Sequence, residues 1–210
     1  LKFTMKDLGH AQHILGMKIT RHREKRQLFL SKANYIRPIL EPFNMQAARS
    51  TSTPLPAKLR LSQTYCPTSG PEGDNMKSVL YTLVVGSLMY AMVVTQPIIA
   101  HAVGVVSRYM HNLDRPHWTA MKNIFRYLVG TQDLDIFFGP NKTSGLVEYI
   151  DSDFADCLDS RKSTSGYFFR FEHEAISRRS KLQECTTTSM TEAEYVARLM
   201  LQTKRYGLVD

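Results

Sequence analysis

Acidic side chains gather at two places in the C-terminal part of the sequence. Asp151 and Asp153 end the run Leu146–Asp153, in which apolar and polar residues alternate. Alternation along a strand places the two aspartates on one face, about 7 Å apart. A divalent cation between two such carboxylates would offset their repulsion. From these residues alone, the favoured interpretation is that the strand frays near Asp151 and that both carboxylates are solvated.

A second acidic pair lies in the helix predicted over residues 190–202. The apolar stripe of that helix has Glu192 and Glu194 on opposite flanks. One of the two glutamates can therefore face the strand that carries Asp151. Periodicity does not choose between them.

Basic side chains crowd a short segment near the start of the chain. Arg21, Arg23, Lys25 and Arg26 lie between strands predicted over 14–19 and 28–30, which indicates a hairpin with a basic tip. The whole chain of 210 residues carries a formal net charge of +8. Such a charge favours anionic partners, nucleic acid first and an anionic membrane second.

The elements that must position these residues can be read from apolar spacing. Ser31 is predicted to cap a helix that Pro38 shortens or bends, and residues 51–74 read as a linker. No charged residue lies between Lys77 and Arg108, which is compatible with a membrane span but better explained by two buried helices meeting at Pro97. A further helix runs from the cap Asp114 to the terminator Gly130.

After residue 145 the pattern changes to strands. Strands are predicted over 146–153, 165–171 and 175–180, and Ser163–Gly166 is predicted to be a β-turn. Three strands and one helix make an unfinished α/β unit, in which one face and one edge of the sheet lack cover. The three cysteines are far apart and indicate reduced thiols in an intracellular protein.

Ten short motifs occur in order along the chain: Phe3–Gly9, Ile14–Met17, Thr53–Leu55, Val85–Tyr90, Ala102-Val103, Ser107-Arg108, Tyr149–Asp153, Arg161–Tyr167, Ser180–Gln183 and Thr191–Tyr195. Together they resemble the Pol polyprotein of copia-type LTR retrotransposons. The resemblance extends from residue 1 to about residue 197.

The resemblance implies an α+β fold in four parts. Residues 1–62 would be the end of a reverse transcriptase, with its primer-grip hairpin and the start of its thumb, and residues 63–75 a linker. Residues 76–144 would form a helical connection, and residues 145–210 a truncated ribonuclease H-like α/β unit. The rest of the polyprotein would lie upstream, and the compartment would be the cytoplasm, in a virus-like particle, or the nucleus.

The same resemblance assigns roles to the acidic residues. Family ribonucleases H cleave the RNA strand of an RNA–DNA hybrid with two Mg²⁺ ions. By motif match Asp151 and Glu194 are catalytic metal ligands and Asp153 assists, which selects Glu194 over Glu192. Two further aspartates of the family pattern do not follow Glu194, and the Tyr-Val-Asp-Asp strand of the polymerase does not occur in this sequence.

We therefore expect a fragment of a Pol polyprotein that binds Mg²⁺ poorly and is catalytically inactive. Two alternatives are open: a non-catalytic nucleic-acid-binding remnant that uses the basic hairpin, and a ribonuclease H completed by another chain. The sequence also departs from the family pattern internally, with Arg178 where the family has tryptophan and with an unfamiliar tail after Ala197. A one-nucleotide frameshift is our hypothesis for that tail.

Overall fold

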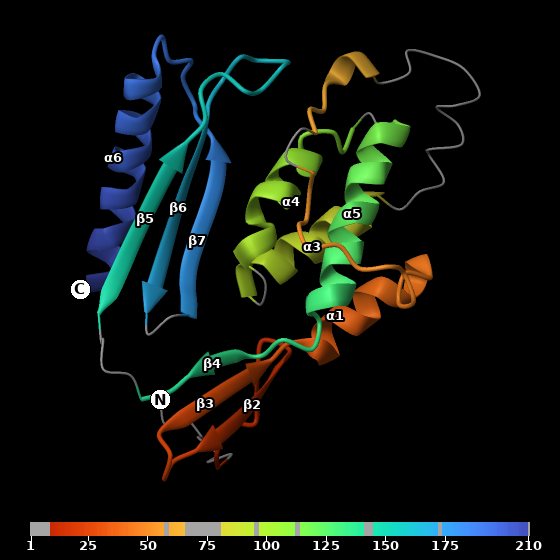
Figure 1. The fold of residues 1–210 in the computed structure, drawn as a ribbon, viewed down its shortest axis with the longest axis vertical. Helices are drawn as coiled ribbons and strands as arrows, with labels where there is room; N and C mark the ends of the chain where they lie inside the picture. The colour runs from red at the N-terminus through yellow and green to blue at the C-terminus, as the bar shows by residue number, and fades with distance from the viewer. Residues whose placement is uncertain are drawn as a thin grey trace, which may run out of the picture.

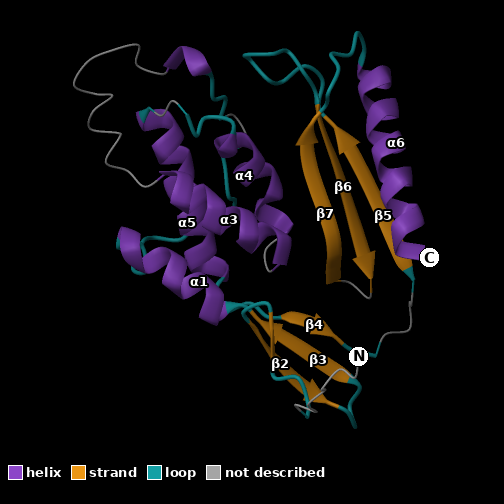
Figure 2. Ribbon diagram, turned by 180° about the vertical axis from the view of Figure 1, so that it is seen from behind, coloured by secondary structure: helices purple, strands orange, loops and turns teal. Residues whose placement is uncertain are grey.

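The chain folds into two antiparallel sheets and a group of helices (Figure 1). A computed structural model describes residues 9–56, 59–65, 81–94, 97–111, 114–140, 145–171 and 174–209. One sheet has the strand order β1-β2-β3-β4 and the other β5-β6-β7. Helix α6 lies against one side of the second sheet, and helices α1, α3, α4 and α5 lie on the side of β7 (Figure 2).

The first sheet contains the predicted hairpin and one strand that was not predicted. Its strands are β1 (His13–Ile14), β2 (Met17–His22), β3 (Gln27–Ser31) and β4 (Ile136–Phe138). The strand predicted over 14–19 is wrong at its start, because Leu15 and Gly16 turn the chain with φ angles of 49° and 79°. Strand β4 joins from far along the chain, with Phe138 opposite Leu28.

The helices share one hydrophobic core. They are α1 (Ala33–Leu40), α3 (Tyr81–Val94), α4 (Ala100–Ser107) and α5 (Arg115–Thr131), with the 3-10 turns Glu41–Phe43, Gln63–Tyr65 and Pro97–Ile99. Each helix contributes at least one side chain with no exposed surface, such as Ile36, Leu88, Val103 and Phe125. Full burial stabilises each such side chain by about 1.5–3 kcal/mol, so this core carries most of the apolar burial in the described chain.

The charge-free run forms two helices, α3 and α4, as predicted for this segment. They meet near Pro97, and residues 95 and 96 lie outside the described residues. Val84, Val85 and Leu88 on α3 are buried in the shared core. No helix among the described residues has both the length and the apolarity that crossing a membrane requires.

Two predicted helix caps are wrong and one is confirmed. Asp114 caps α5 in a reciprocal arrangement with His117, as its residue type predicts. Gly130 does not end that helix, which continues to Thr131; a Cβ at Gly130 would lie 2.9 Å from the Ser50 Cβ, so glycine permits close packing there. Ser31 is the last residue of β3, and Lys32 takes the cap position of α1.

The second sheet consists of β5 (Leu146–Ser152), β6 (Thr164–Phe171) and β7 (Glu174–Leu182), followed by α6 (Met190–Val209). The β-turn predicted at Ser163–Gly166 is wrong, because β6 already begins at Thr164. Helix α6 packs on β5 and β6, and α4 packs on β7 from the other side. The three predicted strands are confirmed. The prediction that one face of the sheet lacks cover is wrong, because α6 lies against one face and α4 against the other (Figure 1).

Candidate functional site

Asp151 and Glu194 line the same pocket, which has a volume of about 380 Å³. Asp151 comes from the end of β5 and Glu194 from the second turn of α6. Ala193 and Ala197 have no exposed surface, so the apolar stripe of α6 faces the sheet and leaves Glu194 at its flank. The remaining lining residues are Ile150, Thr191, Tyr195, Ala197 and Arg198.

Glu192 has a different role from Glu194. Its Oε2 accepts hydrogen bonds from the Thr188 backbone N–H at 2.7 Å and from the Thr188 hydroxyl at 2.9 Å. These bonds lower the pKa of the Glu192 carboxyl and hold the start of α6. Glu194 has no hydrogen-bond or ion-pair partner among the described residues. Helical periodicity did not decide whether Glu192 or Glu194 lies near Asp151. In the structure, Glu194 is the one that lines a pocket together with Asp151.

Asp153 is held apart from this pair by the neighbouring strand. Its Oδ1 accepts a hydrogen bond from the Thr164 N–H at 2.8 Å, and its own N–H donates to the Thr164 carbonyl at 3.1 Å. The carboxylate therefore closes the end of the β5–β6 ladder. Asp151 instead accepts from the adjacent Ser152 N–H at 2.9 Å and remains exposed.

Gln183 fixes α6 against the strands that carry the acidic residues. Its Nε2 lies 2.7 Å from the Ser165 Oγ, 3.3 Å from the Ser152 Oγ and 2.8 Å from the Ala193 carbonyl oxygen. The side chain is buried, so these contacts replace water. Sequence reasoning gave Gln183 no role, although it ends one of the motifs that carry the family resemblance.

A magnesium ion prefers carboxylate and phosphate oxygens and keeps several of its waters. The carboxylates of Asp151 and Glu194, which line one pocket, are ligands of the kind that Mg²⁺ prefers. They could supply some of the oxygen atoms that the ion requires. Within the described residues, no group of three or more histidine, cysteine, aspartate or glutamate side chains is placed to hold a metal ion. Any ion held here would take its other ligands from water, substrate or groups outside these residues.

A second pocket of about 420 Å³ lies on the other side of Asp151, toward α4. It is lined by His101, Asp153, Asp156 and Arg178, among others. Burial lowers the pKa of His101, and the nearby Arg108 lowers it further. His101 lies 3.2 Å from the Ser180 hydroxyl, so this pocket joins the helical region to β7.

The loop between β5 and β6 is tied to the helical region by Asp159. This carboxylate accepts hydrogen bonds from the Ser62 hydroxyl at 2.6 Å, the Gln63 N–H at 3.0 Å and the Tyr109 hydroxyl at 3.1 Å. Partial burial would raise the pKa of Asp159, but these hydrogen bonds together lower it. The loop is thereby held in place just after Asp151 and Asp153.

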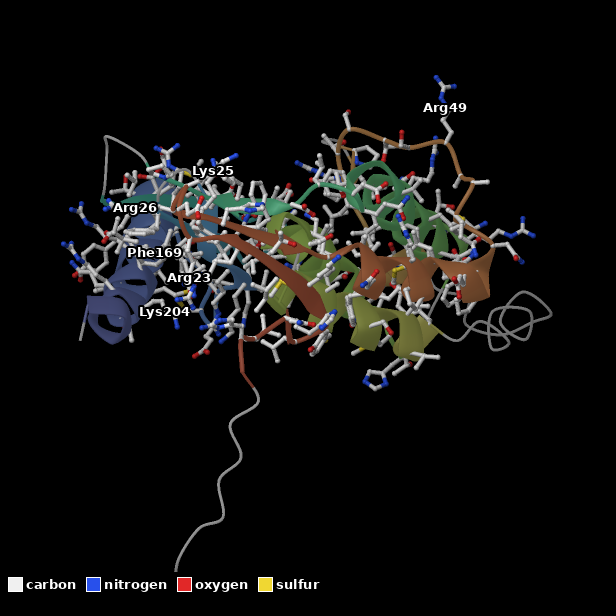
Figure 3. All side chains as sticks on the ribbon, turned by 90° about the horizontal axis from the view of Figure 1, so that it is seen from below. Arg23, Lys25, Arg26, Arg49, Phe169 and Lys204 are labelled. Carbon is white, nitrogen blue, oxygen red and sulfur yellow. The ribbon has the colours of Figure 1, made fainter. Side chains whose placement is uncertain are left out.

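The basic residues of the hairpin are brought together at one end of the molecule. Arg21 lies at the end of β2, and Arg23, Lys25 and Arg26 form the turn. All four are exposed, and Figure 3 shows Arg23, Lys25 and Arg26 at the opposite end from Arg49. The three arginines line a pocket of about 640 Å³ together with Phe138 and Pro140 near β4.

Sequence comparison finds relatives that cover nearly the whole chain. The Retrovirus-related Pol polyprotein from transposon TNT 1-94 of Nicotiana tabacum is 54% identical over 195 residues, which are 93% of this chain and 15% of that protein. An uncharacterized mitochondrial protein of Arabidopsis thaliana is 33% identical, and the match covers 77% of its length. This chain is therefore similar to transposon Pol polyproteins over nearly its whole length.

A further relative carries a different kind of name. The Secreted RxLR effector protein 161 of Plasmopara viticola is 45% identical over 122 residues, which are 58% of this chain and 86% of that protein. No family model matches the chain, and no solved structure matches it. The chain spans 15% of the tobacco Pol polyprotein, so it corresponds to a small part of that protein's length.

Proposed function

We propose that residues 145–210 act as a ribonuclease H-like part of a copia-type Pol polyprotein. Residues 1–62 would end its reverse transcriptase, residues 63–75 would be a linker, and residues 76–144 would form the connection between the two. The observation that carries this proposal is the shared pocket of Asp151 and Glu194. The similarity to transposon Pol polyproteins supports it.

In this proposal Asp151 and Glu194 supply carboxylate oxygens to Mg²⁺. The bound ion would stabilise negative charge on the phosphate of an RNA–DNA hybrid. Ser152 orients Asp151 through its backbone N–H, and Gln183 holds the helix that carries Glu194. Arg198 lines the same pocket and would attract the phosphate.

The chain alone is catalytically inactive in this proposal. The described pocket is lined by two carboxylates, Asp151 and Glu194, whereas Asp153 does not line it and accepts a hydrogen bond from the Thr164 N–H. Removing a single hydrogen-bond donor from a preorganised catalytic site costs about 2.7–4 kcal/mol of transition-state stabilisation, and we expect the absence of metal ligands to cost no less. We therefore expect weak cation binding without cleavage above background.

Paramagnetic Mn²⁺ tests the cation site directly, because it broadens the NMR signals of nearby amides. We expect broadening centred on residues 150–152 and 191–198, and a loss of affinity in Asp151→Asn and in Glu194→Gln. Glu192→Gln is the matched control, since that glutamate binds Thr188. Equal loss in the control, or broadening centred elsewhere, would exclude the proposed site.

A second function is favoured by the exposed hairpin cations. The segment 21–26 contains four cations, Arg21, Arg23, Lys25 and Arg26, and a single carboxylate, that of Glu24. They would contact the phosphates of a nucleic acid without reading its sequence. This role is independent of the Asp151 pocket and would persist in an inactive chain.

Salt dependence tests the hairpin function. We expect Arg23→Gln combined with Arg26→Gln to weaken binding of a labelled RNA–DNA hybrid and to reduce the logarithmic salt slope by about one per cation removed. Arg49→Gln is the control, because Arg49 is exposed at the opposite end of the molecule (Figure 3). An unchanged slope in the double variant would contradict the proposal.

A further inference from the structure

Three aromatic rings form a row across the first sheet, one from each of three neighbouring strands. The Phe29 ring on β3 lies 4.8 Å from the Phe137 ring on β4, measured between centroids. On the other side, the His22 ring on β2 lies 5.9 Å from Phe29 in an edge-to-face arrangement. We call His22, Phe29 and Phe137 the aromatic row.

The aromatic row lies on the open face of this sheet. Thr20 stands directly opposite Phe29, and side chains two residues apart along a strand share a face, so Lys18, Thr20 and His22 lie on the same side as Phe29. Lys18, Thr20 and His22 are all exposed. Phe137 exposes 38% of its surface, and Phe29 is half-buried between the other two rings.

The backbone beyond β4 is shaped to accept the Phe137 ring. A Cβ placed on Gly139 would lie 2.4 Å from the Phe137 Cζ and 2.9 Å from its Cε1. Both atoms belong to the ring, so the ring rests against the glycine backbone. A residue with a Cβ at position 139 would therefore require the Phe137 ring to shift.

Cations lie near the aromatic row toward both ends of β2. Arg23, Lys25 and Arg26 form the turn that follows His22, and Lys18 lies on the same face as the rings. Exposed rings beside a basic rim suit a polyanion that also has flat apolar groups. A single-stranded nucleic acid has both, because its phosphates are charged and its bases are free to stack.

We propose that the aromatic row is a stacking platform for the bases of a single-stranded RNA or DNA segment. The hairpin cations would hold the phosphates of the same strand. This inference rests on the second function proposed above, that of the hairpin, and not on the Asp151 pocket. It specifies that the ligand is single-stranded, because the bases of a double helix are stacked inside it and cannot contact the sheet.

An abasic strand separates stacking from charge attraction. Binding of an oligothymidylate and of an abasic deoxyribose-phosphate strand of equal length would be measured by fluorescence anisotropy with the full chain. We expect the strand with bases to bind at least about fivefold tighter. Phe137→Leu should remove most of that difference while preserving the salt slope, and Phe137→Trp should restore it.

Two further variants complete the design. Phe154→Leu is the matched control, because Phe154 exposes 41% of its surface and lies in the loop after β5. Gly139→Ala should reduce the base-dependent difference by displacing the Phe137 ring. Thermal unfolding of each variant shows that a loss of binding does not come from a loss of fold.

The outcomes distinguish this inference from the function on which it rests. Equal binding of the two strands overturns the platform and leaves phosphate binding by the hairpin intact. An equal effect of Phe137→Leu and Phe154→Leu also overturns it, because stacking would then lie elsewhere. Failure to bind either strand overturns the platform and the hairpin function together.

Discussion

The helical region and the C-terminal sheet are packed very differently. In the helical region, side chains from α1, α3, α4 and α5 meet in one core around Phe125 and Leu88, which have no exposed surface. In the C-terminal sheet, the buried apolar cluster consists of Tyr167, Phe169 and Leu201. Large apolar side chains such as Tyr149, Ile150 and Tyr195 remain exposed there.

The residues that form the large core and the residues proposed to bind a cation therefore lie in different parts of the chain. The well-packed helical region carries none of the acidic residues proposed to bind a metal ion, whereas Asp151 lies on the thinly packed sheet and Glu194 on α6, which packs against that sheet. The thin packing is supplemented by polar contacts, chiefly those of Gln183 and Asp159. The positions of the acidic side chains therefore depend on a few hydrogen bonds more than on a core.

The largest expected effect is on the helical core. Phe125→Ala should lower the free energy of unfolding by about 3–5 kcal/mol, because Phe125 is fully buried and stacks on Phe43. Phe154→Ala is the control and should change it by about 0.5 kcal/mol or less, since Phe154 exposes 41% of its surface. Urea unfolding measures the free energy of unfolding of both variants. Similar decreases in the two would contradict the difference in packing between the two regions.

Lys32 gives an expected effect of the opposite sign, where the two regions meet. Burial lowers the pKa of Lys32 from 10.5 to about 8, against weaker raising effects of Glu174 on β7 and Asp135 before β4. The Lys32 amine therefore binds a proton more tightly in the unfolded chain than in the folded one. The free energy of unfolding is greatest above pH 10.5, and this extra stability is lost as the pH falls from 10.5 through about 8. At neutral pH the charged amine costs about 3 kcal/mol.

Replacing that amine should stabilise the protein. We expect Lys32→Met to raise the free energy of unfolding at pH 7 by about 1–3 kcal/mol, and to raise it less at high pH, where the lysine is neutral in both states. Urea unfolding of the two proteins across this pH range provides the measurement. A destabilised variant at pH 7 would show that the charge of Lys32 is satisfied by its acidic neighbours.

Gln183→Ala should have a smaller effect, confined to the C-terminal sheet. It leaves the Ser165 hydroxyl and the Ala193 carbonyl without their buried partner, at a cost of about 1–3 kcal/mol. Amide hydrogen exchange should become faster in α6 and stay unchanged in α5. Equal acceleration in both helices would mean that the two regions unfold as one unit.

The sequence predicted the local elements well where a single physical signal determined them. The cap at Asp114, the break at Pro97 and the hairpin around Arg23 follow from residue type and apolar spacing. Strand β4 was not predicted, because three residues are too few to show an alternation of apolar and polar side chains, and its partner β3 is distant in the sequence. The role of Gly130 was misread because glycine at a helix end and glycine at a close contact look the same in sequence.

The candidate site was predictable only in part. Alternation placed Asp151 on a strand, and the family resemblance selected Glu194. Neither source indicated that Asp153 would be bound by the Thr164 N–H. The contacts of Gln183 and Asp159 join residues distant in sequence, so only the folded chain brings them together.

The central claim is that the acidic pocket binds a cation without completing a nuclease. Its most direct test is cleavage of a labelled RNA–DNA hybrid by the purified chain with Mg²⁺ or Mn²⁺, beside Asp151→Asn. Our account predicts no cleavage above that variant from a folded sample. Cleavage by the chain that is abolished in Asp151→Asn would show a complete catalytic site and contradict the account.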